Sequence, residues 1–223
     1  MAKYTKLQTL TAIKETGMVP VFYNADVEIA KKVVRACWEG GVRAFEFTNR
    51  GDFAQQVFSE LSKFVVKECP GMILGAGTII DPATAAIYIQ LGANFIVGPY
   101  LNPDVARLCN RRGIPYSPGC GSVTEIGTAQ ELGCDLCKVF PAGSVGGPGF
   151  VKGVLAPLPW SMIMVTGGVE PEEENLTKWM KSGVTAVGMG SKLFPKEMIS
   201  AGNWEAISQK CREALGWIAA ARG

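Results

Sequence analysis

Residues 162–191 read MIMVTGGVEPEEENLTKWMKSGVTAVGMGS, and this stretch shows the pattern that decides the fold. A short apolar run is followed by a glycine-rich turn, a helical segment, a second apolar run and a second glycine-rich turn. The two apolar runs, Met162–Thr166 and Ala186–Met189, have the length and composition of buried strands. A strand, a helix and a strand in this order form one βαβ unit.

The same alternation extends over the rest of the chain. Eight strand candidates follow one another at intervals of roughly 20–30 residues, the size of one βα unit. The other six are Met18–Tyr23, Arg43–Thr48, Met72–Gly75, Phe95–Pro99, Ile114–Ser117 and Leu136–Pro141. This repeat predicts an α/β fold, a (β/α)8 TIM barrel in a single domain over residues 1–223. The alternative is a doubly wound open sheet, but no G-x-G-x-x-G or Walker motif supports it.

Two helices are expected in addition to those of the repeat. Residues 5–15 predict an extra N-terminal helix before the barrel, and residues 203–220 predict a closing helix. Within the repeat, a polar side chain at the start of a helical pattern predicts the beginning of a helix. Such capping residues are Asp52, Asp81, Asn102 and Ser122.

Composition restricts the chemistry and the partners. The 223 residues include no histidine, which excludes Ser-His-Asp and Cys-His nucleophiles and every histidine-ligated metal site. The formal net charge of +2 is too small to indicate binding to nucleic acid or to an acidic membrane surface.

The cysteines and the absence of a targeting pattern indicate the compartment. The seven cysteines are scattered, no leader pattern precedes a cleavage site, and no apolar run reaches 18 residues. We therefore expect a reduced, cytoplasmic protein. Cys134 and Cys137 form a C-x-x-C pair, but residues three apart on a strand point to opposite faces, so we expect no metal site there.

Polar side chains at the ends of the predicted strands are the candidates for a site, because a barrel of this kind carries its active site there. In the second strand, alternation places Glu46, Thr48 and Arg50 on one face and the phenylalanines on the other. A structural Glu46–Arg50 ion pair is the alternative interpretation. At the third strand end, Gly77 and Thr78 offer an amide and a hydroxyl to a carboxylate, although this signal is weak alone.

Lys138 is the strongest candidate, because a lysine within an apolar strand needs a reason. Lys138 and Phe140 share a face, and if that face is the interior, Lys138 lies near Glu46. Burial or a neighbouring cation such as Arg50 would then favour the uncharged amine. An uncharged amine attacks a ketone and forms a Schiff base, which makes cleavage of an adjacent C–C bond possible without a metal.

The glycine-rich turns after the last two strands predict a phosphate site. Gly167 and Gly168 follow the seventh strand, and Gly190 and Ser191 follow the eighth. Turns at these two positions form the usual phosphate site of a barrel, since their free N–H groups and a helix N-terminus face the anion. Glycines that only close the turns are the alternative.

Several motifs together resemble the bacterial KDPG/KHG aldolases, which cleave 2-keto-3-deoxy-6-phosphogluconate (KDPG) and 4-hydroxy-2-oxoglutarate (KHG). The resemblance extends from about residue 19 to residue 194. The motifs that carry it are Gly41-Val-Arg-Ala-Phe-Glu46-Phe-Thr, Gly75-Ala-Gly-Thr78, Pro118-Gly-Cys-Gly-Ser-Val-Thr-Glu125, Lys138-Val-Phe-Pro-Ala142, Thr166-Gly-Gly-Val169 and Gly190-Ser191.

The resemblance implies roles for individual residues. Lys138 matches the Schiff-base lysine, and Glu46 matches the carboxylate that moves protons through a water. The family residues around the pyruvate-derived moiety are matched by Arg50, Thr78 and Phe140, with Arg50 and Thr78 toward its carboxylate. The family residues at the phosphate end are matched by Gly167, Gly168 and Ser191. The family also implies a homotrimer and a reaction that needs no metal or other cofactor.

The chain departs from the family at the mouth of the expected site. Many members carry an arginine after the first strand, where this chain has Val21-Phe-Tyr23-Asn24, and Asn49 replaces an aliphatic residue before Arg50. In the Pro-Gly loop, Ser122 stands where a threonine is common. We expect these substitutions to affect the choice of substrate and to leave the lysine chemistry unchanged.

The expected function is reversible cleavage of KDPG, or of a related 2-keto-3-deoxy acid, to pyruvate and glyceraldehyde 3-phosphate through a Lys138 Schiff base. An aldolase for KHG or for 2-keto-3-deoxy-6-phosphogalactonate is the nearest alternative. A phosphate-binding isomerase or epimerase with Glu46 as its base is another. The last alternative function is that of a barrel that binds its ligand without catalysis.

Overall fold

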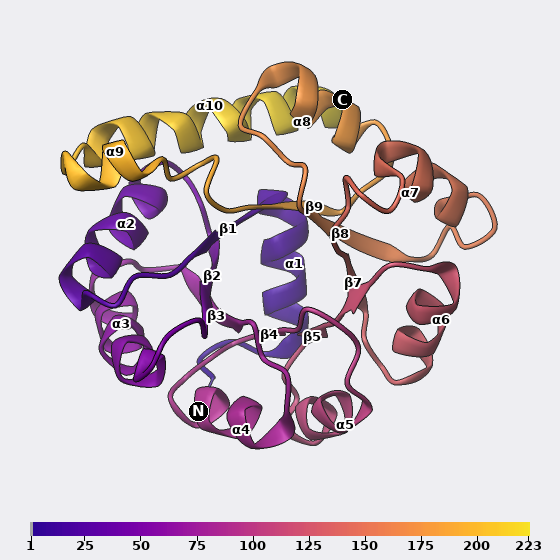
Figure 1. Cartoon of the computed structure of the whole chain (residues 1–223), viewed down its shortest axis with the longest axis horizontal. Coiled ribbons are helices and arrows are strands. Elements are labelled where there is room, and N and C mark those ends of the chain that lie inside the picture. Colours follow the sequence, from indigo (N-terminus) through magenta and orange to yellow (C-terminus); the bar gives the residue numbers. More distant parts are fainter. Residues whose placement is uncertain (1) are drawn as a thin grey trace.

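The computed structural model describes residues 2–223, whose strands run parallel to one another in a nearly closed barrel (Figure 1). Neighbouring strands follow the order β5-β4-β3-β2-β1-β9-β8-β7-β6, so β5 and β6 stand at its two ends. The strands are β1 (Met18–Phe22), β2 (Ala44–Thr48), β3 (Ile73–Gly77), β4 (Ile96–Val97), β5 (Tyr116–Ser117), β6 (Gly119–Cys120), β7 (Leu136–Val139), β8 (Met162–Thr166) and β9 (Ala186–Met189).

The strand count differs from the sequence-based prediction in one place. Where one strand is predicted over residues 114–117, β5 and β6 form on either side of Pro118, and nine strands result within residues 2–223. Proline has no N–H to donate to a neighbouring strand, while the Pro118 carbonyl accepts a hydrogen bond from the Lys138 N–H. The predicted bounds of β8 and β9 are confirmed residue for residue.

Helices surround the barrel, and α1 lies behind its centre in the view of Figure 1. None of the helices in residues 2–223 combines the length and apolar character needed to cross a membrane. The helices are α1 (Lys6–Thr16), α2 (Val27–Glu39), α3 (Ala54–Glu68), α4 (Pro82–Gln90), α5 (Pro103–Arg112), α6 (Val123–Glu131), α7 (Gly147–Leu155), α8 (Glu173–Met180), α9 (Lys196–Ser200) and α10 (Trp204–Arg222). The predicted extra helix and closing helix are confirmed as α1 and α10.

Three of the four predicted helix starts are confirmed. Asp81, Asn102 and Ser122 each accept a hydrogen bond from an N–H group in the first turn of the following helix. The prediction for Asp52 is wrong, because the chain enters α3 through Phe53 in the left-handed conformation, at a φ of 59° and without a side-chain cap.

Apolar side chains of two layers position the site. The larger layer lies between the strands and the outer helices and includes Phe45 and Phe47 of β2. The smaller layer lies inside the barrel, and most of its strand residues come from the first half of their strands, Val19 and Ala44 among them. Ile13 of α1 packs in this inner layer, so α1 covers the amino ends of the strands. The polar groups of the barrel interior therefore gather at the opposite, carboxyl edge.

Candidate active site

Glu46 of β2 and Lys138 of β7 both point into the barrel. The predicted alternation is confirmed, because Phe45 and Phe47 pack in the outer layer while Glu46 is only 1% exposed. Lys138 is 6% exposed, and its Nζ lies 4.7 Å from the centre of the Phe140 ring. The interior orientation that the sequence left open for Lys138 is therefore the one that the structure shows.

The surroundings of Lys138 favour its uncharged form. Burial lowers the pKa of the Lys138 amine below its usual value near 10.5, because the apolar interior penalises the ammonium. Arg50 lowers this pKa further by charge repulsion, whereas the Glu46 carboxylate opposes the shift. More of the amine is thus available as a nucleophile at neutral pH than in a solvent-exposed lysine.

The environment of Glu46 also favours the uncharged form, and for a carboxyl group this means that the pKa is raised. Burial raises the pKa of the Glu46 carboxyl, and the cations Lys138 and Arg50 only partly offset this rise. Its Oε2 atom accepts no hydrogen bond from any group of residues 2–223. A carboxyl with a raised pKa and an unoccupied oxygen is suited to take up and release a proton.

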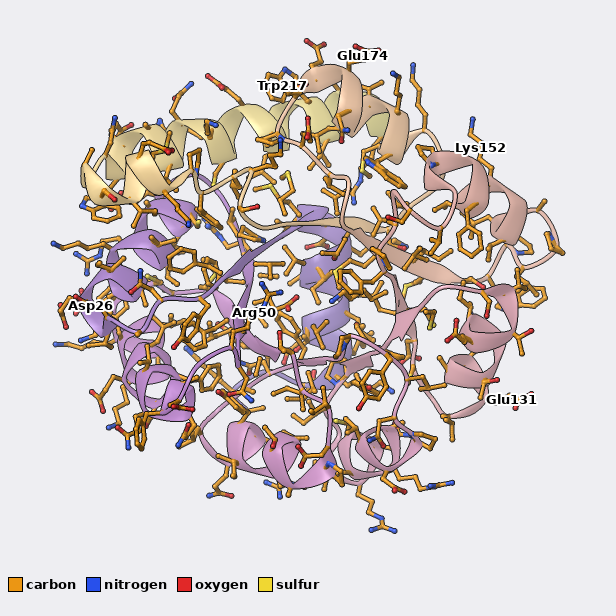
Figure 2. All side chains as sticks on the ribbon, viewed as in Figure 1. Asp26, Arg50, Glu131, Lys152, Glu174 and Trp217 are labelled. Carbon is orange, nitrogen blue, oxygen red and sulfur yellow. The ribbon has the colours of Figure 1, made fainter. Side chains whose placement is uncertain are left out.

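Arg50 lies at the centre of the ring of strands, in contrast to the peripheral Asp26 and Glu131 (Figure 2). Its Nε donates a hydrogen bond to Thr78 Oγ1 at 3.3 Å, so two residues expected near a substrate carboxylate are in contact. No ion pair joins Arg50 to Glu46 within residues 2–223, so the structure does not support the alternative of a structural Glu46–Arg50 ion pair.

A pocket of about 790 Å³ opens above these groups at the carboxyl edge of the strands. Its lining includes Thr48, Phe140 and Thr166. Each of these residues comes two positions after a side chain that points into the barrel one layer lower. Glu46 and Lys138 belong to that lower layer, which explains their burial. Of the predicted site residues, the lining contains Arg50, Phe140, Gly167, Gly168, Gly190 and Ser191.

The glycine turns bring backbone N–H groups to the end of the pocket formed by β8 and β9. Gly167 and Gly168 adopt positive φ angles of 89° and 81°, a backbone conformation that residues other than glycine rarely take. Within residues 2–223, the N–H groups of Gly168, Gly190 and Ser191 donate no hydrogen bond. Clustered free N–H groups of this kind suit an anion.

Two lysines and one carboxylate at the same end were missed by the sequence analysis. Glu170, Lys192 and Lys196 all line the pocket. Lys192 directly follows one glycine turn and Glu170 lies two residues after the other, and no other feature of the sequence pointed to them.

The departures from the family pattern fall into two groups. Tyr23 and Asn24 line the pocket, as expected of mouth residues. The expectation for Asn49 is wrong, because its Oδ1 accepts a hydrogen bond at 2.9 Å from the hydroxyl of the buried Tyr88. Asn49 shares the outward face of β2 with Phe45 and Phe47, so it contacts the helix layer and does not line the pocket. Ser122 caps α6 and does not line the pocket either.

We expect Gly77→Ala to disable the site. A Cβ at position 77 would overlap Glu46 Oε1, so the carboxyl group must leave its place. Loss of a positioned acid/base group predicts a fall in kcat of about 10²-fold or more. The matched control is Gly127→Ala in α6, where a Cβ meets no atom within 4 Å. Equal kcat values for the two variants would show that the position of Glu46 is unimportant.

The pKa of Lys138 also predicts a pH profile. Arg50 lowers this pKa, so Arg50→Met should raise it and move the rising limb of Schiff-base formation with pyruvate to higher pH. Arg50→Lys keeps the cation and should move the limb less. The rate of pyruvate adduct formation, measured against pH, checks this prediction. A limb that stays in place in Arg50→Met would contradict the electrostatic role of Arg50.

The fold and the site together define a class of protein. A parallel barrel with a buried lysine amine and a buried carboxyl group below a pocket at the carboxyl edge of its strands is equipped to form and break Schiff bases. The model of the KDPG and KHG aldolase family matches residues 10–210. The chain therefore belongs to this family, whose members are lyases.

Curated relatives agree over nearly the full length. The 2-dehydro-3-deoxy-phosphogluconate aldolase of Pseudomonas aeruginosa is 34% identical, with 92% of this chain and 90% of the relative covered. The enzyme of the same name from Treponema pallidum is 32% identical, over 92% of this chain and 96% of its own. The KHG/KDPG aldolase of Escherichia coli is 31% identical, over 92% and 93%.

Solved structures agree as well. A 4-hydroxy-2-oxoglutarate/2-dehydro-3-deoxyphosphogluconate aldolase from TTHB1 is similar with a TM-score of 0.81 at 32% identity, over 94% of this chain and 98% of its own. The KDPG aldolase of Legionella pneumophila, solved with pyruvate as a covalent carbinolamine intermediate, has a TM-score of 0.82 at 26% identity, over 92% and 96%.

Proposed function

We propose that this chain is a class I aldolase that reversibly cleaves KDPG to pyruvate and glyceraldehyde 3-phosphate. The observation that carries the proposal is the buried Lys138 amine, whose pKa the Glu46 carboxylate influences, two residues before Phe140, which lines a pocket with cations at both ends. A substrate with a carboxylate at one end and a phosphate at the other matches that distribution of charge.

The proposed reaction begins at the amine. Lys138 Nζ attacks the C2 ketone, and loss of water gives an iminium that acts as the electron sink. Glu46, through a water, removes the proton of the C4 hydroxyl, and the electrons of the C3–C4 bond move into the iminium as the aldehyde leaves. Glu46 then returns a proton to C3 of the enamine, and hydrolysis releases pyruvate. The iminium accepts the electrons, so this sequence uses no metal or organic cofactor.

The other predicted residues bind and orient the substrate in this proposal. Arg50 and Thr78, already in contact with each other, hold the carboxylate of the pyruvate moiety. The Phe140 ring packs beside the amine and keeps water from it. Gly167, Gly168, Gly190 and Ser191 hold the phosphate with their backbone N–H groups and the serine hydroxyl.

Turnover of defined substrates tests the proposal. Release of pyruvate is measured with KDPG, with its galactonate epimer and with KHG as substrates. We expect the highest kcat/KM with a phosphorylated substrate. A higher value with KHG would assign the chain to the unphosphorylated alternative, and no pyruvate from any of the three would contradict the proposed function.

We further propose that the 223 residues work as one domain within a homotrimer. Ile80 and Tyr100 support a contact between copies, since both large side chains are about half exposed and the Tyr100 hydroxyl donates to the Ile80 carbonyl at 3.4 Å. Sedimentation at three times the mass of the chain would support the trimer, and sedimentation as a monomer would contradict it.

Two further proposals concern the closure of the barrel and the location of the protein. We propose that β5 and β6 occupy one position of the barrel, since Pro118 alone separates them, which restores the (β/α)8 pattern. We also propose a cytoplasmic location, which the seven unpaired, buried cysteines support.

A further inference from the structure

Four charged side chains line the pocket, and they are unevenly distributed. Arg50 belongs to the β2 end, whereas Glu170, Lys192 and Lys196 belong to the segments after β8 and β9. An anionic substrate would bind poorly beside a free carboxylate, so the presence of Glu170 at the phosphate end requires an explanation.

Glu170 is paired with one of the two lysines. Lys192 Nζ lies 3.1 Å from Glu170 Oε1, and this ion pair joins the two segments that supply the glycine turns. The Lys192 side chain is 66% exposed and that of Glu170 is 36% exposed. Ion pairs at such exposure contribute little to stability, so Lys192 can exchange Glu170 for a stronger acceptor at small cost.

A phosphate dianion is such an acceptor. It carries more charge than a carboxylate, and it would also receive hydrogen bonds from the free N–H groups of Gly168, Gly190 and Ser191. On the basis of the proposed function, we propose that Lys192 is a specificity-determining residue that moves from Glu170 to the terminal phosphate of the substrate. Glu170 competes with the phosphate for the same ammonium.

The test compares two aldehydes in the condensation direction, with pyruvate as the common partner. Glyceraldehyde 3-phosphate carries the phosphate and glyceraldehyde lacks it. The measured quantity is the preference, defined as the ratio of the two kcat/KM values. We expect Lys192→Gln to lower this preference about tenfold, which corresponds to about 1.4 kcal/mol.

A second variant tests the competition. Glu170→Gln leaves the Lys192 ammonium without its carboxylate, so the preference for the phosphorylated aldehyde should rise severalfold. The matched control is Lys178→Gln, which breaks the 2.6 Å ion pair with Glu174, a residue on the outer side of α8 (Figure 2). The control should leave the preference unchanged.

Salt gives an independent readout. Added salt screens charge interactions, so the preference of the unaltered protein should fall with ionic strength more steeply than that of Lys192→Gln. A merely structural role of Lys192 would not produce this difference.

The outcomes separate this inference from the proposed function. An unaltered protein that condenses neither aldehyde with pyruvate would contradict both. An active protein whose preference is the same in Lys192→Gln, or moves in the same direction in both variants, would overturn only the role of Lys192.

Discussion

Replacement of Lys138 by methionine is expected to abolish aldol cleavage, with a fall in kcat of about 10⁴-fold or more, the scale seen when a catalytic nucleophile is removed. Methionine has a similar length and packs against aromatic rings, so it preserves the contact with Phe140. Without the amine, no iminium forms to accept the electrons of the C3–C4 bond. Pyruvate release from KDPG measures the loss.

The fold should survive this substitution. Burial opposes the charged form of Lys138, so an apolar side chain of the same length removes an unfavourable group from the interior. Glu46 loses the cation that lowers its pKa, and its carboxyl then takes up a proton more readily. We expect cooperative thermal unfolding, which would show that the variant still folds. Measurable KDPG cleavage by the folded variant would contradict the proposed role of Lys138. Lys138→Ala should lose turnover in the same way.

Glu46→Gln should separate adduct formation from proton transfer. The amide keeps the shape of the side chain but cannot shuttle protons, so kcat should fall by about 10²–10⁴-fold. The Glu46 carboxylate raises the pKa of Lys138, so its removal lowers that pKa further and the amine stays available. The pyruvate adduct should therefore still form while turnover is lost.

Deuterium exchange at the methyl group of pyruvate isolates the step assigned to Glu46. In D₂O the unaltered protein should exchange these protons through the enamine, and Glu46→Gln should slow the exchange in parallel with kcat. The control is Glu131→Gln at the periphery of the molecule, which should change neither rate (Figure 2). Unchanged exchange in Glu46→Gln would assign the proton transfer to another group.

The parts of the fold that follow a local pattern could be predicted from the sequence. Strands β8 and β9 have the predicted bounds because each is an apolar run that ends in a glycine turn. The interruption at Pro118 was missed, since the next two residues carry no strand pattern and pair only because β7 lies beside them. Similarly, the left-handed turn at Phe53 replaces the predicted cap at Asp52, and no local signal marks it.

The site was predictable to the extent that alternation determines which face a side chain occupies. Glu46 and Lys138 lie inside the barrel as that argument requires, since their neighbours Phe45 and Val139 belong to the outer layer. Asn49 follows the same rule and should have been assigned to the outer face. Lys192 and Glu170 could not be found in this way, because a cross-loop ion pair depends on the distance between two turns.

The central claim is that the Lys138 amine forms a covalent adduct with the ketone. The most direct measurement is incubation with pyruvate and borohydride, followed by mass spectrometry of the digested protein. We predict one reduced pyruvate adduct per chain, located on Lys138 and absent from Lys138→Met. An adduct on a different residue, or no adduct at all, would contradict the account.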